Sequence, residues 1–276
     1  MRLPSGAAVP DMYLWASLLR RLENQPGSGV PVRGARVVSI WSEDHTDAQR
    51  VARACQIDSI CATPEEVCDG VDAVMILSER PETHLPYARA ALERGLRTYV
   101  DKPLADTPDA AREIFTLAER HGAPCYTGSA VRWSPEFLAA REHIRTKPNR
   151  AKALHVQCPL GLDLYGIHAI ELANLFLGHD VDTIHTTTGP DRQIVLLTYT
   201  NGATALLDHL NFLRWPTYAA TIHADTWHHH VTLDDPAPTL LAFTRTFADF
   251  ANGAPPPVNP QESLHLINIL TTTQRS

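Results

Sequence analysis

The 276-residue sequence has no basic run, no long apolar run and a net charge of -7. The negative charge argues against nucleic acid as a partner, because recognition of phosphates requires a positive patch. No apolar segment approaches the roughly 18 residues that a membrane span requires. The N-terminal residues also lack the charged-then-apolar layout of a signal peptide. These absences predict a cytoplasmic protein that binds neither nucleic acid nor membranes.

Paired cysteines are also absent. The five cysteines are odd in number and none has CxxC spacing, which indicates reduced thiols and no zinc site. The run His228-His229-His230 is the one stretch that suggests a metal. On a strand, however, His229 would point away from the other two, and no carboxylate or cysteine completes a ligand motif. We therefore predict no metal site, and we interpret these histidines as sheet-surface or interface residues.

Lysine is scarce, with three residues against twenty-one arginines. Lys102 stands out among them because it lies at the end of a predicted strand and precedes Pro103. A lysine ammonium is compact and loses its proton when desolvated, which a guanidinium does not do. This favours a catalytic role for Lys102. The alternative is an ordinary solvated loop lysine, since position alone is weak evidence for catalysis.

The segment around Lys102 predicts a βαβ unit. The apolar run 73–77 is typical of a strand buried on both faces of a parallel sheet, and a helix ending at Gly95 follows it. A second strand, 97–100, leads into Asp101 and Lys102. Such a crossover makes the two strands parallel neighbours, and ligands bind beyond their carboxyl ends. The sequence therefore places a binding edge at Ser78 and Asp101-Lys102.

These motifs, in this order, resemble the glucose–fructose oxidoreductase / inositol dehydrogenase (Gfo/Idh/MocA) family. The matching stretches are Ser78 with Pro81-Glu82-Thr83-His84, then Asp101-Lys102-Pro103, Ser129 to Pro135, and Tyr165-Gly166-Ile167-His168. The resemblance implies an α/β + α+β protein. A Rossmann-like parallel-sheet domain (1–128) would bind NAD or NADP, and an α+β domain with a mostly antiparallel open sheet (129–276) would bind a small polar, sugar-like substrate.

The resemblance also implies roles for individual residues. Lys102 would bond the reacting oxygen, and His168 would act as acid/base or orient the substrate. Tyr165 and Arg132 would contact the substrate, and Lys102 and His168 would face one cleft between the domains. The implied cofactor contacts are Gly6, Ser42, Ser78, His84, Asp101 and Lys102.

The histidine motif departs from the family pattern. The family carries an acid four residues before the histidine, one turn away on the same helical face. Here that position is Leu164, and the acid found is Asp163. A leucine cannot hold a histidine tautomer or move a proton. His168 is therefore interpreted either as a functional residue without its usual partner or as a satisfied core histidine.

The N-terminal residues depart further. A Rossmann domain opens with an apolar strand and a glycine-rich turn, but here Gly6 is the one glycine before a predicted helix over 11–22. Gly27 and Gly29 form a GxG pattern, but they precede a predicted strand instead of following one, which argues against a phosphate-binding turn. With Pro10 removing a backbone donor, we predict weak NAD(P) binding, in the high-micromolar range or worse.

Cofactor preference stays open. Ser42 occupies the position of the usual ribose-binding acid, which favours tolerance of a 2′-phosphate, whereas Glu43 and Asp44 beside it would repel one. Two functional hypotheses follow. The first is an NAD(P)-dependent oxidoreductase, and the second is a family member that has lost redox chemistry and uses its cleft for non-redox catalysis, binding or assembly. Because an open sheet exposes apolar surface, we also predict a homo-oligomer, a twofold dimer formed through the second domain.

Overall fold

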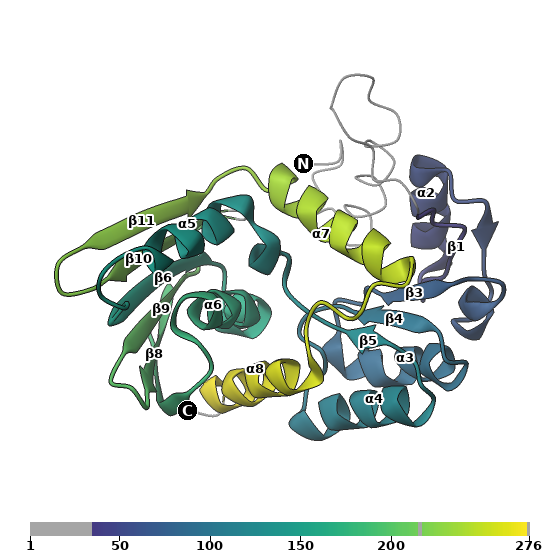
Figure 1. The fold of residues 1–276 in the computed structure, drawn as a ribbon. Helices are drawn as coiled ribbons and strands as arrows, with labels where there is room; N and C mark the ends of the chain where they lie inside the picture. The colour runs from purple at the N-terminus through teal and green to yellow at the C-terminus, as the bar shows by residue number, and fades with distance from the viewer. Residues whose placement is uncertain (1–34, 215–216, 275–276) are drawn as a thin grey trace. The chain divides into compact units, whose positions relative to one another are not determined.

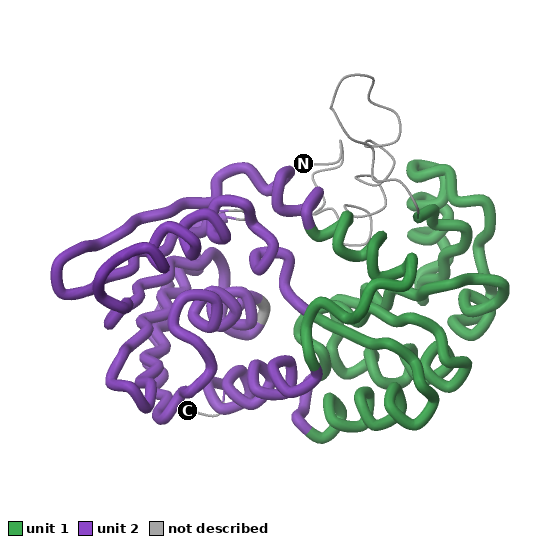
Figure 2. The backbone as a smooth tube through the Cα atoms, in the orientation of Figure 1, with its two compact units in different colours: residues 1–105, 109–127, 243–259 green, residues 106–108, 128–242, 260–276 purple. Residues whose placement is uncertain are grey.

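The computed structural model describes residues 35–214 and 217–274, which form two compact units (Figures 1 and 2). Unit 1 contains the described residues up to Ala105, Asp109–Thr127 and Phe243–Asn259. Unit 2 contains Asp106–Pro108, Gly128–Ala242 and the residues from Pro260 onward. Gly6, the predicted helix over 11–22 and the Gly27–Gly29 stretch lie outside the described residues.

Unit 1 is a Rossmann-like arrangement of parallel strands and helices. Its three-stranded sheet has the order β3-β4-β5, and β1 pairs in parallel with β2. The strands are β1 (Ser39–Ile40), β2 (Ser59–Ile60), β3 (Ala73–Ile76), β4 (Arg97–Val100) and β5 (Cys125–Tyr126). The helices are α2 (His45–Cys55), α3 (His84–Glu93) and α4 (Pro108–Arg120), with short 3-10 turns η1 (Glu65–Cys68) and η2 (Pro81–Thr83).

The predicted βαβ unit around Lys102 is confirmed. β3 and β4 are parallel neighbours, with Ile76 opposite Val100, and Gly95 after α3 has a φ of 72°, in the left-handed region that a side chain would strain. The prediction that β3 is buried on both faces is wrong. Val74 is buried, but Met75 is half-buried, because β3 is an edge strand of its described sheet and lines a cavity.

A segment distant in sequence completes the core of unit 1. The second half of α7 (Ala237–Ala251) brings Phe243 to 5.1 Å from the ring of Tyr99 and Phe250 to 4.7 Å from the ring of Tyr126. Arg97 lies over the Phe250 ring, 4.5 Å from its centroid. Its guanidinium also donates to the carbonyls of Phe250 and Ala254. These contacts hold residues 243–259 in unit 1.

Unit 2 is built on a six-stranded sheet of order β11-β10-β6-β9-β8-β7. All neighbouring strands are antiparallel except β6 and β9, which are parallel, so the predicted mostly antiparallel sheet is confirmed. The strands are β6 (Ala153–Pro159), β7 (Val181–Thr188), β8 (Arg192–Tyr199), β9 (Thr204–Leu210), β10 (Tyr218–His223) and β11 (His228–Leu233). The remaining elements are η3 (Ala130–Trp133), α5 (Pro135–Arg145), α6 (Leu162–Leu177) and α8 (Pro260–Thr273).

The two faces of this sheet differ in burial. α6 packs against β6 and β9, and the strand residues on that face, such as Val156, Leu197 and Leu207, are fully buried. On the opposite face Leu196 is 37% exposed. Figure 1 shows α5 and α6 on one side of the sheet. Unit 2 therefore has one covered and one open sheet face. None of the helices in the described ranges combines the length and apolarity needed to cross a membrane.

Candidate functional site

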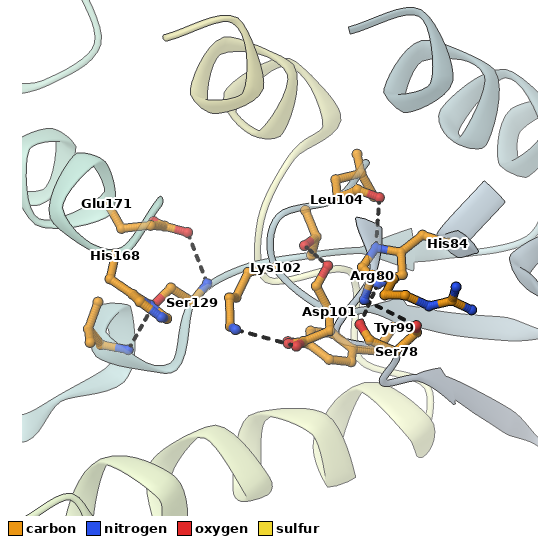
Figure 3. Close-up of polar contacts among 12 residues, drawn as sticks. Ser78, Arg80, His84, Tyr99, Asp101, Lys102, Leu104, Ser129, His168 and Glu171 are labelled. Carbon is orange, nitrogen blue, oxygen red and sulfur yellow. Dashed lines mark hydrogen bonds and ion pairs between the residues drawn. The ribbon is translucent and has the colours of Figure 1, made fainter. Parts of the chain in front are cut away.

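The first polar cluster lies where β3 and β4 end. The two strands are in register, and the Asp101 N–H donates to the Ile76 carbonyl at 2.9 Å. Lys102 follows, with its side chain 18% exposed and its Nζ 3.8 Å from Oδ2 of the buried Asp101. The Tyr99 hydroxyl donates to the other Asp101 oxygen at 2.9 Å. Figure 3 shows the Lys102 side chain directed toward this carboxylate, which provides a counter-charge for the ammonium.

His84 connects the loops that follow β3 and β4. Its ring is fully buried, with Nδ1 3.1 Å from the Leu104 carbonyl and Nε2 2.8 Å from the Ser78 carbonyl. Because protein carbonyls contact both ring nitrogens, His84 does not offer either one to a cofactor (Figure 3). The predicted cofactor contact does not match this geometry, which suits a positioning role for His84. The Ser78 hydroxyl accepts from the Arg80 N–H at 3.2 Å and from the Thr83 hydroxyl at 2.8 Å.

The two acidic residues after β1, Glu43 and Asp44, make different contacts. Asp44 caps α2, since its carboxylate accepts from the Thr46 N–H at 2.9 Å. Glu43 accepts two hydrogen bonds from Arg80 Nη2, at 2.6 and 2.7 Å, and a third from the Tyr87 hydroxyl. The two carboxylates that were expected to repel a phosphate are thus a helix cap and the partner of an arginine. The sequence did not single out Arg80 or Tyr87, which are 37 and 44 residues from Glu43.

A cavity of about 640 Å³ opens between these elements within unit 1. Apolar residues of β1 and β3, among them Ile40 and Val74, line its walls, and Ser42, Glu43 and Tyr87 lie at its polar part. Apolar walls suit a flat adenine ring, and hydroxyl and carboxylate groups suit a ribose diol. The residues present therefore fit the adenosine half of a dinucleotide.

The second polar cluster lies at the start of α6 in unit 2. His168 is 7% exposed, and its Nδ1 is 2.5 Å from the Ser129 hydroxyl oxygen (Figure 3). The Tyr165 ring lies one helical turn earlier, 4.9 Å from the imidazole between centroids. Asp163 is exposed in the first turn of α6. The residue at Nδ1 of His168 is therefore a serine, 39 residues away in sequence.

A buried ion cluster supports Ser129 from behind. Glu171, which is 1% exposed, accepts from the Ser129 N–H at 3.1 Å and from Arg132 Nε at 2.9 Å. Arg132 also pairs with Glu262 of α8. Burial alone lowers the pKa of Arg132, but the charges of Glu171 and Glu262 outweigh burial and raise this pKa above its usual value. Nε and Nη2 of Arg132 contact these two carboxylates, and its substrate contact stays a prediction.

The three-histidine run follows the strand alternation that was predicted for it. His229 contacts His143 of α5, with ring centroids 4.8 Å apart, whereas His230 Nδ1 lies on the other face, 2.9 Å from the Thr221 hydroxyl. Within residues 35–214 and 217–274, no three His, Cys, Asp or Glu side chains come together as a group that could hold a metal ion.

Comparisons with known proteins agree with this architecture. Residues 20–129 match a family model described as an oxidoreductase family with an NAD-binding Rossmann fold, GFO_IDH_MocA. An inositol 2-dehydrogenase/D-chiro-inositol 3-dehydrogenase of Halalkalibacterium halodurans is 23% identical over 203 residues, which cover 70% of this chain and 55% of that protein. Residues 20–129 of the chain are therefore similar to the Gfo/Idh/MocA family.

Other similar proteins extend the comparison. A D-xylose 1-dehydrogenase (NADP(+)) of Haloferax volcanii is 27% identical over 197 residues, which cover 62% of this chain and 60% of that protein. The fold matches the crystal structure of GenD2 from gentamicin A biosynthesis in complex with NAD, with a TM-score of 0.79, 17% identity and coverage of 95% and 90% of the two chains. The matched regions span between 32% and 55% of the length of three curated relatives.

Proposed function

We propose that this protein is an NAD(P)-dependent oxidoreductase acting on a hydroxyl or carbonyl group of a small polar, sugar-like substrate. The observation that carries the proposal is Lys102, a mostly buried lysine at the end of β4 with the Asp101 carboxylate beside it. The inositol and xylose dehydrogenases among the relatives support the substrate class. When bound, the nicotinamide would supply hydride transfer; the residues of the chain would bind and orient the substrate and handle its proton.

Lys102 and His168 have complementary roles in this proposal. The Lys102 ammonium would hydrogen-bond the reacting oxygen, and its amine form would take up the proton of a hydroxyl. The neighbouring carboxylate of Asp101 would hold the ammonium in place. His168 would contact a substrate oxygen from unit 2, and Tyr165 packs against its ring. Unit 1 would thus bind the dinucleotide and unit 2 the substrate.

A direct assay tests this proposal. Inositols and aldopentoses would be supplied with NAD⁺ or NADP⁺, and formation of the reduced cofactor would be followed by absorbance. We expect turnover with at least one substrate of this class. Absence of turnover, together with absence of NADH and NADPH binding in calorimetry, would overturn the proposal and favour a family member without redox chemistry.

The cofactor that fits the Glu43–Arg80 pair best is NAD. A free arginine at this edge would bind the 2′-phosphate of NADP, because a guanidinium matches phosphate geometry. Glu43 instead binds Arg80 through both carboxylate oxygens. The remaining proposed cofactor contacts are Ser42 and Ser78, at the ends of β1 and β3, and Asp101 and Lys102, at the end of β4.

Replacing Glu43 by glutamine is expected to shift the preference toward NADPH. Loss of the carboxylate charge frees Arg80 for the 2′-phosphate, and one charge-assisted hydrogen bond corresponds to about a tenfold gain in affinity or more. Calorimetric titration with NADH and NADPH measures the ratio of the two dissociation constants. Glu79→Gln is the matched control, because it removes a neighbouring cavity-lining charge without touching the Glu43–Arg80 pair. An unchanged ratio in Glu43→Gln would refute the assignment.

We further propose that the protein is a cytoplasmic homodimer formed through the open face of the unit 2 sheet. Leu196 on β8 lies opposite Leu206 on β9, at the middle of that face, and an exposed apolar sheet surface is a common interface. None of the five cysteines, which all lie within the described residues, forms a disulfide, which supports a reducing compartment.

Light scattering is expected to give the mass of a dimer at micromolar concentration. Leu196→Asp should give the monomer mass, because it places a charge in the desolvated centre of the interface. Far-UV circular dichroism would verify that this variant keeps its fold. A monomeric wild type, or a Leu196→Asp variant that stays dimeric, would contradict an interface on this face.

A further inference from the structure

The residue that contacts Nδ1 of His168 determines which ring nitrogen carries the proton, and that residue offers a hydroxyl. Ser129 is fully buried at the N-cap of η3, and its Oγ lies 2.5 Å from His168 Nδ1. The same Oγ accepts a hydrogen bond from the Val131 N–H at 3.3 Å. Since a hydroxyl has one proton to donate, the placement of that proton fixes the imidazole tautomer.

Two arrangements are conceivable for this pair. If the Ser129 hydroxyl donates to Nδ1, its proton is satisfied and the Val131 N–H uses an acceptor site on the oxygen. If Nδ1–H donates to Oγ instead, the Ser129 proton needs another acceptor, and among the described residues the structure shows none for it. A buried hydroxyl proton without an acceptor is unfavourable. The first arrangement therefore prevails, and Nδ1 is the acceptor.

The backbone of Ser129 keeps the hydroxyl in this place. Its N–H donates to Glu171, and its carbonyl accepts from the Arg132 N–H at 3.1 Å. Glu171 lies on α6, one turn after His168, so the helix that carries the imidazole also anchors the residue that contacts it. Ser129 and His168 are thus held to each other at two points.

We propose that Ser129 is a positioning residue that fixes neutral His168 with its proton on Nε2. In this tautomer Nε2 is a hydrogen-bond donor and has no lone pair to accept a proton. A carboxylate in place of Ser129 would do the reverse, because it would hold a proton on Nδ1 and leave Nε2 as a base. With Ser129 at Nδ1, His168 would therefore donate a hydrogen bond from Nε2 to a substrate oxygen.

The consequence for the reaction rests on the proposed function. If neutral His168 donates a hydrogen bond, it cannot accept the proton of a substrate hydroxyl, and another group must do so. In the proposed function, Lys102 would accept that proton. The pair would then divide the work, with proton transfer at Lys102 Nζ and substrate orientation at His168 Nε2.

The tautomer can be measured without any assay of activity. Protein labelled with ¹⁵N-histidine would be examined by NMR at about pH 8.5, above the usual histidine pKa of roughly 6.5, and the His168 signals would be assigned by their loss in His168→Gln. We expect a protonated Nε2 and an unprotonated Nδ1 in the wild type. A wild-type spectrum with the proton on Nδ1 would overturn the proposal.

Variants of two buried serines sharpen the test. Ser129→Asp is expected to move the proton to Nδ1, and Ser129→Ala to give a mixture of both tautomers. Ser134→Ala is the matched control, because Ser134 is equally buried and caps α5 in the same unit; it should leave the His168 signals unchanged. A Ser129→Ala spectrum identical to the wild type would refute the role of Ser129. Protonation on Nε2 in a protein that lacks dehydrogenase activity would refute the proposed function and support the tautomer assignment.

Discussion

Replacing Lys102 by alanine is expected to reduce kcat/KM by about 10² to 10⁴, the usual contribution of a positioned acid or base. The melting temperature should change by only a few degrees, because the Lys102 ammonium is 3.8 Å from the Asp101 carboxylate and the Tyr99 hydroxyl still donates to that carboxylate in the variant. Steady-state kinetics and thermal unfolding measure the two effects. Lys147→Ala, in the loop after α5, is the matched control and should leave both quantities unchanged.

A second variant separates charge from proton transfer at this position. Lys102→Arg keeps a positive charge, but arginine is not deprotonated in proteins. We expect Lys102→Arg to be nearly as inactive as Lys102→Ala. Full activity in Lys102→Ala would remove Lys102 from the reaction, whereas full activity in Lys102→Arg would rule out only its proton transfer. Unfolding of Lys102→Ala would assign Lys102 a structural role.

Replacing Glu171 by alanine is expected to destabilise the protein by about 3–5 kcal/mol, the usual result of breaking a buried ion pair. The carboxylate is almost fully buried, and its loss leaves Arg132 partly unpaired and the Ser129 N–H without its acceptor. The free energy of unfolding in urea measures the effect.

Glu142→Ala provides the matched comparison for Glu171. Glu142 also pairs with an arginine, Arg145 at 3.4 Å, but both side chains are about two-thirds exposed. Exposed pairs contribute roughly 0–1 kcal/mol, so this variant should unfold close to the wild type. A loss in Glu171→Ala no larger than in Glu142→Ala would show that the buried cluster does not stabilise the fold.

Local patterns account for what could be predicted from the sequence. The strand at 97–100 and the left-handed Gly95 depend on residues within a few positions of one another. The turn at Asn201-Gly202 is of the same kind, with Gly202 at a φ of 81°. Periodicity and turn chemistry report such short-range features directly.

The contacts that define the site join residues that are distant in the sequence. Glu43 meets Arg80, and Ser129 meets His168, only because the chain returns to the same place after 37 and 39 residues. Nothing in a serine's sequence neighbourhood shows that it will contact a particular histidine. The absence of the family's acid at position 164 was readable from the sequence, but the residue beside the imidazole was not.

The contacts between residues 243–259 and the earlier segments of unit 1 have a consequence for the timing of folding. Tyr99 and Tyr126 pack against Phe243 and Phe250, and Arg97 donates to carbonyls of the same segment. Domains usually fold as units during synthesis, beginning with the N-terminal one. Here the ribosome must translate all of unit 2 up to Ala242 before it supplies the helix that covers these rings. The aromatic surface of the nascent first unit therefore stays exposed until residue 259 has left the exit tunnel. During that interval we expect chaperones to bind it.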